Sequence, residues 1–207
     1  MELSAQIKEA VRILKKGGVV AYPTDTVYGL GASMESPEAV ERVFAVKSRP
    51  RSMALPVLVA SVAQIEALAG RITPAAHCLI KAFLPGAMTL VLPASDLVPE
   101  YLRAREGTIA LRIPDHSVPL ALITGIGTGI VGTSANLSGR PSPVTADDVR
   151  SQLGDTVDLI IDGGGCGGKE STIIDVTGEV PRVLRSGAVG QEEIERVCGQ
   201  GLAGNGG

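Results

Sequence analysis

Short apolar segments typical of strands alternate with amphipathic segments typical of helices along nearly the whole chain. The predicted strands cover 18–22, 56–60, 88–93, 108–113, 129–133, 157–161, 171–176 and 181–185. The predicted helices lie near 5–16, 37–47, 61–69, 74–83, 117–124, 146–153 and 190–198. No long linker and no internal repeat divides this pattern, which favours one domain of the α/β class in which helices cover a mixed sheet.

Capping residues and prolines place several of the predicted boundaries. Ser4 is the expected N-cap of the first helix. After the first strand, Pro23 begins a polar loop that we expect to run from 24 to 31. The domain is predicted to cover 1–198, and the Gly-rich segment 199–207 is predicted to be a flexible tail.

Composition narrows the class of function. A formal net charge of −3 and an aromatic content of 2% argue against binding nucleic acid over the whole surface or stacking single-stranded bases. The 3 cysteines are scattered without metal-ligand spacing, which is typical of reduced thiols in the cytoplasm. We see no apolar run of the ~18 residues that a membrane span needs and no signal-peptide pattern. We therefore expect a cytoplasmic protein without membrane contact.

Polar donors gather in segment 131–143, VGTSANLSGRPSP, directly after an apolar strand. Thr133, Ser134 and Asn136 come first, followed by further hydroxyls and an arginine. A buried strand does not need so many donors at one end, whereas an oxyanion or phosphate site does. The alternative is a Ser/Asn turn that caps the next helix.

Cations gather in segment 46–51, VKSRPR, just past the expected end of a helix. In an extended chain alternate side chains point the same way, so Lys47 and Arg49 would converge on one anion. The alternative is a solvated helix end whose cations complement the helix dipole. We favour phosphate binding.

Two other site types are disfavoured. Gly163, Gly168 and Lys169 match most of the P-loop spacing, but Glu170 stands where the Mg²⁺-binding hydroxyl belongs, and a strand is predicted to follow. The 2 histidines lie far apart, so no metal site is predicted.

Several blocks, taken in order, resemble the YrdC-like family: PTDTVYGLGA, VKSRPR, PGAMTLVLPA, TIALRIPDH, GTSANLSGRPSP, STIIDV and RVLRSGA. The resemblance implies a twisted mixed sheet with helices on its faces and a concave, positively charged cavity. It also implies a nucleotidyltransferase that makes L-threonylcarbamoyladenylate and pyrophosphate from L-threonine, bicarbonate and ATP. Mg²⁺ would arrive with ATP. The product would pass to a transferase complex that forms threonylcarbamoyladenosine in tRNA.

The resemblance further implies roles for individual residues. Lys47, Arg49, Ser134 and Asn136 match the family's K-x-R and S-x-N motifs and would carry catalysis. ATP would contact Arg49, Met53, Thr108, Ser134, Ser142 and Arg185. Threonine would contact Thr26, Leu58, Arg112, Thr133 and Ser171. Arg112 would meet the carboxylate, because a guanidinium fork suits a planar anion.

The chain departs from the family pattern at two of these positions. Met53 replaces a common asparagine, and only its backbone can serve a phosphate, because a methionine side chain is no donor. Leu58 replaces a common histidine and removes a polar group from the amino-acid pocket.

Two alternative functions stay open. One is carbamoyl transfer from carbamoyl phosphate, as in the YrdC-like domain of hydrogenase-maturation proteins. The other is a double-stranded RNA-binding or ribosome-maturation module, because a concave basic face would suit the backbone of A-form RNA. The net charge of −3 and the density of hydroxyl donors favour the enzyme.

Overall fold

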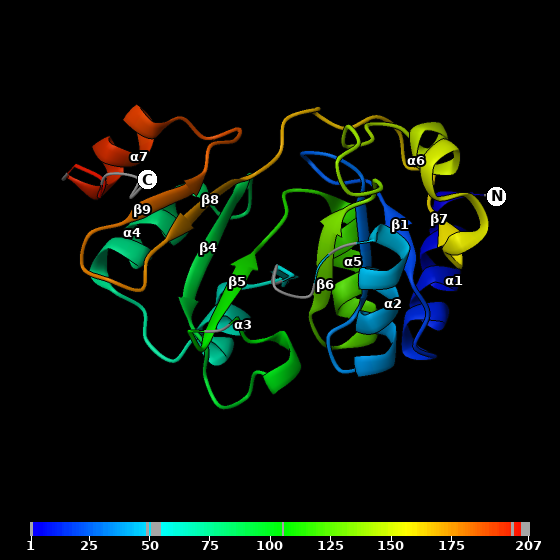
Figure 1. The fold of residues 1–207 in the computed structure, drawn as a ribbon, viewed down its shortest axis with the longest axis horizontal. Helices are drawn as coiled ribbons and strands as arrows, with labels where there is room; N and C mark the ends of the chain where they lie inside the picture. The colour runs from blue at the N-terminus through cyan, green and yellow to red at the C-terminus, as the bar shows by residue number, and fades with distance from the viewer. Residues whose placement is uncertain (1, 49, 51–54, 105, 200, 204–207) are drawn as a thin grey trace.

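The computed structural model describes residues 2–48, 50, 55–104, 106–199 and 201–203. Within these residues the strands form one mixed sheet in the order β7-β1-β2-β6-β3-β5-β4-β8-β9. The strands are β1 (Val20–Tyr22), β2 (Gly29–Ser33), β3 (Val57–Leu58), β4 (Met88–Pro93), β5 (Thr108–Arg112), β6 (Ile130–Ser134), β7 (Leu159–Ile160), β8 (Thr172–Asp175) and β9 (Arg182–Arg185). The α/β class with a twisted mixed sheet is confirmed (Figure 1).

Helices cover this sheet, and short 3-10 turns lie at Glu100–Leu102 and Gly154–Thr156. The helices are α1 (Leu3–Lys15), α2 (Pro37–Lys47), α3 (Val62–Leu68), α4 (Pro74–Phe83), α5 (Ser117–Ile126), α6 (Ala146–Leu153) and α7 (Gln191–Cys198). Thr145 and Asp148 form the capping box that opens α6. The expected cap at Ser4 is wrong, because α1 already begins at Leu3 and its N-cap residue makes no side-chain hydrogen bond.

The predicted polar loop at 24–31 also needs a correction, because β2 begins at Gly29. β2 pairs antiparallel with β1 on one side and with β6 on the other. Its sequence, GLGAS, gives little strand signal, since glycine normally weakens a strand interior. Here the glycines are required by packing: a Cβ at Gly31 would lie 2.5 Å from the carbonyl oxygen of Val131.

Two apolar clusters lie on opposite faces of the sheet. The larger joins strand residues such as Leu30, Leu90 and Leu111 to α2, α3, α4, α6 and α7. The smaller joins Val20 and Ile130 to α1 and α5. Because α1 and α5 pack over β1, β6 and β7 and not over β4, β5 and β8, they leave part of that face open (Figure 1).

We expect Gly31→Ala to lower the free energy of unfolding by about 1–3 kcal/mol, the usual range for an overpacked core. The added methyl group would meet backbone on β6 as well as the Tyr22 hydroxyl at 2.9 Å, so β2 would have to shift. Urea unfolding followed by circular dichroism measures the change. Gly178→Ala is the matched control, because nothing lies within 4 Å of a Cβ there. Equal midpoints for the two variants would contradict the packing argument.

Candidate active site

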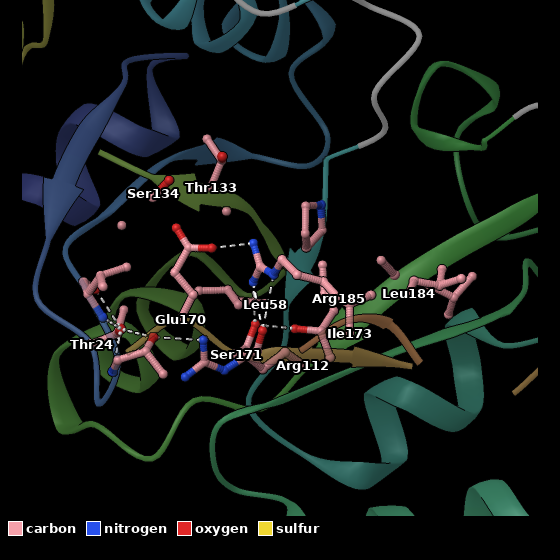
Figure 2. Close-up of a pocket in the computed structure, with 18 of the residues that line it drawn as sticks. Thr24, Leu58, Arg112, Thr133, Ser134, Glu170, Ser171, Ile173, Leu184 and Arg185 are labelled. Atoms are coloured by element: carbon pink, nitrogen blue, oxygen red, sulfur yellow. Dashed lines mark hydrogen bonds and ion pairs between the residues drawn. The ribbon is translucent and has the colours of Figure 1, made fainter. Parts of the chain in front are cut away.

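A cavity of about 340 Å³ lies over the open part of the sheet (Figure 2). Its floor is formed by side chains that share one face of β4, β5 and β8, namely Thr89, Val91, Thr108, Ala110, Arg112 and Ile173. The volume suits a small ligand, for which pockets of about 300–1,000 Å³ are usual. The floor combines apolar side chains with the hydroxyls of Thr89 and Thr108 and the guanidinium of Arg112.

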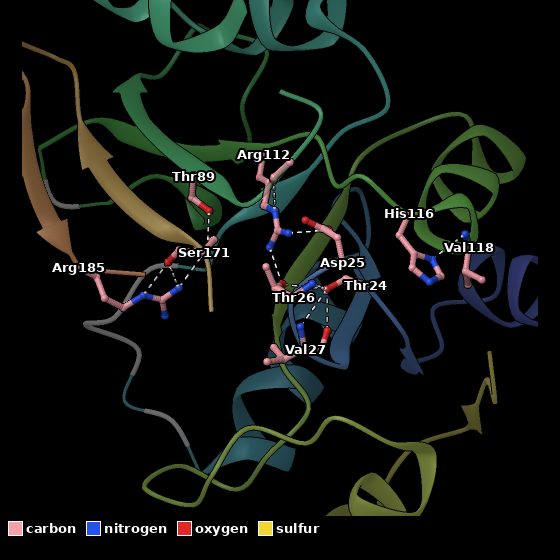
Figure 3. Close-up of polar contacts among 11 residues, drawn as sticks. Thr24, Asp25, Thr26, Val27, Thr89, Arg112, His116, Val118, Ser171 and Arg185 are labelled. Carbon is pink, nitrogen blue, oxygen red and sulfur yellow. Dashed lines mark hydrogen bonds and ion pairs between the residues drawn. The ribbon is translucent and has the colours of Figure 1, made fainter. Parts of the chain in front are cut away.

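Arg112 is held at the buried end by three groups (Figure 3). Its Nη2 donates to Asp25 Oδ1 at 2.6 Å, its Nη1 to Thr26 Oγ1 at 3.0 Å, and its Nε to the carbonyl oxygen of Gly86 at 2.9 Å. Burial lowers the pKa of the Arg112 guanidinium, and the neighbouring Asp25 carboxylate raises it in part. An arginine stays charged under such conditions. The guanidinium is therefore a fixed, desolvated cation with part of its fork still available for an anion.

Thr24 organises the loop that presents these partners. Its hydroxyl donates to the carbonyl oxygen of Val27 at 2.7 Å and accepts from the backbone N–H groups of Thr26 and Val27. Such local hydroxyl bonds are typical of an ST-turn. The loop is thus held in one shape, with Thr26 and Asp25 facing Arg112.

Arg185, at the end of β9, lies near the mouth of the same cavity (Figure 2). Its Nη2 donates to the carbonyl oxygen of Ser171 at 2.8 Å and to Ser171 Oγ at 3.1 Å. Ser171 is buried and exchanges a further hydrogen bond with Thr89. The side chain of Arg185 is 43% exposed, whereas that of Arg112 is 8% exposed. The cavity therefore has one buried cation and one cation open to solvent.

Glu170 reaches into the mouth beside these groups, a position that the sequence did not predict. Its Oε2 pairs with Arg185 Nη1 at 2.6 Å, and its Oε1 accepts from Ser142 Oγ at 2.5 Å. The two partners come from the end of β9 and from the loop after β6. No local pattern signals such a pairing, because it depends on residues that meet only in the fold.

Lys47 contacts the S-x-N segment, whose first residue, Ser134, lines the cavity. Lys47 is 2% exposed, and its ammonium donates to the carbonyl oxygens of Ser134 and Asn136 and to Asn136 Oδ1. The Ser134 hydroxyl also donates to Asn136 Oδ1, at 2.5 Å. The expected extended stretch is wrong at Lys47 and Ser48, because Lys47 ends helix α2 and Ser48 adopts a left-handed conformation with φ 51°.

Most of the residues implied by the resemblance line this one cavity. They are Thr26, Leu58, Thr108, Arg112, Thr133, Ser134, Ser171 and Arg185. Lys47, Asn136 and Ser142 are not among the lining residues but bond to residues that are or to their neighbours. Arg49 and Met53 lie outside the described residues. The individual ligand contacts assigned to these residues stay predictions.

Tyr22 carries the one buried side-chain polar atom without a hydrogen-bond partner among the described residues. Its hydroxyl lies close to Gly31 and Gly132, and Tyr22, Gly132 and Leu58 all line the cavity. Burial strongly raises the pKa of Tyr22, so the hydroxyl stays protonated. The leucine at 58 offers it no acceptor.

In the described part of the chain, no group of three or more His, Cys, Asp or Glu residues is placed to hold a metal ion. No helix in those ranges has the length and apolarity needed to cross a membrane.

Comparisons with known proteins agree with this geometry. A family model, Sua5/YciO/YrdC, described as "Telomere recombination", matches residues 12–187. Threonylcarbamoyl-AMP synthase of Bacillus subtilis (strain 168) is 42% identical over 94% of this chain and 57% of its own length. A protein of Mycobacterium tuberculosis (strain H37Rv) is 43% identical over 95% of this chain and 90% of its own length.

A solved structure supports the same assignment. The crystal structure of Pyrococcus abyssi Sua5 complexed with L-threonine superposes with a TM-score of 0.92 and 42% identity, over 98% of this chain and 59% of that one. The chain thus spans a little over half the length of the Bacillus and Pyrococcus relatives. Extended sequence identity and a shared fold, with the family's motif residues gathered around one cavity, show that the chain belongs to the Sua5/YciO/YrdC family.

Proposed function

We propose that the protein is an L-threonylcarbamoyladenylate synthase, which forms this product and pyrophosphate from L-threonine, bicarbonate and ATP. One observation carries the proposal: a buried guanidinium and an exposed one, Arg112 and Arg185, line a single cavity together with the hydroxyls of Thr133 and Ser134. A small carboxylate fits the buried cation, and a larger, strongly charged phosphate chain fits the open end. The name of the Bacillus relative and the threonine bound to the Pyrococcus relative support this choice.

The chemistry needs no nucleophile from the protein. The amine of threonine adds to CO₂ derived from bicarbonate and loses a proton, which gives a carbamate. A carbamate oxygen then attacks the α-phosphorus of ATP, and the bond to the β-phosphate oxygen breaks to release pyrophosphate. The protein holds the two reactants in line and stabilises the charge on phosphate, as is usual for phosphoryl and nucleotidyl transfer.

Each end of the cavity has a separate task in this scheme. Arg112 holds the carboxylate of threonine, with Thr26 and Asp25 fixing its orientation. Arg185 and Ser134 face the phosphates. Mg²⁺ carried by ATP would neutralise part of the triphosphate charge while keeping most of its water ligands. We further propose that the product passes in the cytoplasm to the transferase complex that modifies tRNA.

Pyrophosphate release tests the proposed reaction. We expect release from ATP and bicarbonate to require threonine when the standard amino acids are supplied one at a time. Serine is the critical comparison, because it lacks only the methyl group, and such a difference is worth about 10- to 200-fold in a closed pocket.

Three results would contradict the proposal. Pyrophosphate release that does not depend on the amino acid would show that the cavity is not a threonine site. Turnover that instead requires carbamoyl phosphate would favour carbamoyl transfer. Salt-sensitive binding of double-stranded RNA without any pyrophosphate release would favour the RNA-binding alternative.

A further inference from the structure

The carboxylate of Glu170 occupies a position where the proposed function requires a phosphate. It accepts hydrogen bonds from Ser142 Oγ and from Arg185 Nη1, and both residues are predicted ATP contacts. Figure 2 shows Glu170 extending toward Arg185, with Thr133 and Ser134 above it. A carboxylate and a phosphate present the same kind of acceptor oxygen to a guanidinium and a hydroxyl. The two anions therefore seek the same donors.

The backbone fixes Glu170 at this position. The carbonyl oxygen of Glu170 accepts from the backbone N–H of Ala188 at 2.8 Å. Gly187 packs so closely that a Cβ there would lie 2.4 Å from the backbone of Ser171 and 2.5 Å from the carbonyl oxygen of Glu170. Ser171, the next residue, is buried and bonded to Thr89 and Arg185. The side chain thus starts from an anchored segment, unlike a typical surface glutamate.

The charge balance changes when a nucleotide enters. Glu170 neutralises part of the charge of Arg185 through their ion pair. A triphosphate that reached the same donors would place several negative charges beside the carboxylate, and like charges in a partly desolvated site repel strongly. The Glu170 side chain therefore has to release Arg185 and Ser142 before phosphate binds them.

We propose that Glu170 is an internal competitor of ATP, a carboxylate that bonds to Arg185 and Ser142 and is displaced from them by a phosphate group of the nucleotide. The inference rests on the proposed function, because it presumes that ATP binds at this end of the cavity. It assigns to Glu170 the control of nucleotide affinity. It also ties the loop after β6 to the end of β9 until the nucleotide separates them.

ATP binding to the intact chain tests the proposal. Calorimetric titration with ATP, without threonine or bicarbonate, is carried out with Mg²⁺ and again with EDTA. We expect Glu170→Gln to bind ATP about 2- to 5-fold more tightly than the wild type under both conditions, the upper part of the range for a partly exposed ion pair. Glu66→Gln, an exposed residue of α3, is the control for the same change in net charge. In the Arg185→Ala background, adding Glu170→Gln should no longer raise the affinity for ATP.

Unchanged or weaker ATP affinity in Glu170→Gln would overturn the inference, and Glu170→Ala checks the result with a side chain that cannot bond to either partner. Weaker binding only with Mg²⁺ would also overturn it, because it would make Glu170 a ligand of the nucleotide's cation. If the wild type itself binds no ATP, the proposed function fails as well. If the wild type binds ATP and the two Glu170 variants bind no better, the inference fails alone.

Discussion

Arg112→Ala is expected to lower kcat/KM for threonine by about 10²–10³, the usual loss when one key charged donor is removed from an active site. The guanidinium is 8% exposed and already positioned by Asp25 and Thr26, so the substrate carboxylate meets an ordered cation. No water molecule or flexible side chain can replace that arrangement at low cost. Steady-state kinetics with threonine varied at saturating ATP measures the loss.

The same substitution leaves Asp25 without its partner. The Asp25 side chain is 17% exposed, and a carboxylate that loses its ion pair in such a place destabilises the fold. We therefore expect a lower urea midpoint as well as lower activity. Arg112→Lys separates the two effects, because an ammonium can keep the pair with Asp25 but cannot supply the planar fork.

Arg112→Ala should weaken the use of threonine without weakening the binding of ATP. ATP affinity should stay within about threefold of the wild type, because Arg185 and the S-x-N segment are untouched. Arg71→Ala is the matched control, since Arg71 pairs with Glu179 on the surface, where the side chains are 61% and 82% exposed. A parallel fall in ATP affinity, or an unchanged kcat/KM for threonine, would show that Arg112 does not bind the amino acid.

The sequence predicted the fold class because the hydrophobic periodicity of strands and helices is a local property that can be read within one short segment. Segments such as 88–93 and 108–113 carry enough branched apolar residues to identify themselves as strands. β2 does not, because its glycines are selected by contacts with Tyr22 and Val131 rather than by strand propensity. Tertiary packing, and not intrinsic strand propensity, makes this segment a strand.

The candidate site was less predictable from the sequence than the fold class. The density of donors after β6 indicated a polar site from the sequence alone, whereas roles such as that of Arg112 came from the family resemblance. Glu170 gave no signal, because its partners Ser142 and Arg185 are distant in sequence and meet it only across the cavity mouth. For Lys47 the residue type suggested phosphate binding, but the fold turns its side chain toward backbone carbonyls.

Lys47→Met is expected to lower the free energy of unfolding by about 1–3 kcal/mol, the usual cost of leaving buried hydrogen-bond acceptors without a donor. The Lys47 ammonium has three N–H donors, and the carbonyl oxygens of Ser134 and Asn136 together with Asn136 Oδ1 accept from it. Its own carbonyl oxygen accepts from the backbone N–H of Ser138. Urea unfolding measures the loss, and Lys81→Met on the exposed side of α4 is the control.

The effect of Lys47→Met on catalysis shows whether Lys47 acts as a brace, by positioning Ser134 and Asn136, or binds phosphate itself. As a brace, Lys47 acts through Ser134 and Asn136, so Lys47→Met and Ser134→Ala should each lower kcat by about 10²–10³, and the double variant should lose little more than either one. As an independent phosphate ligand, Lys47 would give losses that multiply, because separate contacts contribute additively to the free energy. A multiplied loss, or a urea midpoint equal to that of the wild type, would contradict the bracing role. Because the ammonium already has an acceptor for each of its donors, we expect the non-additive result.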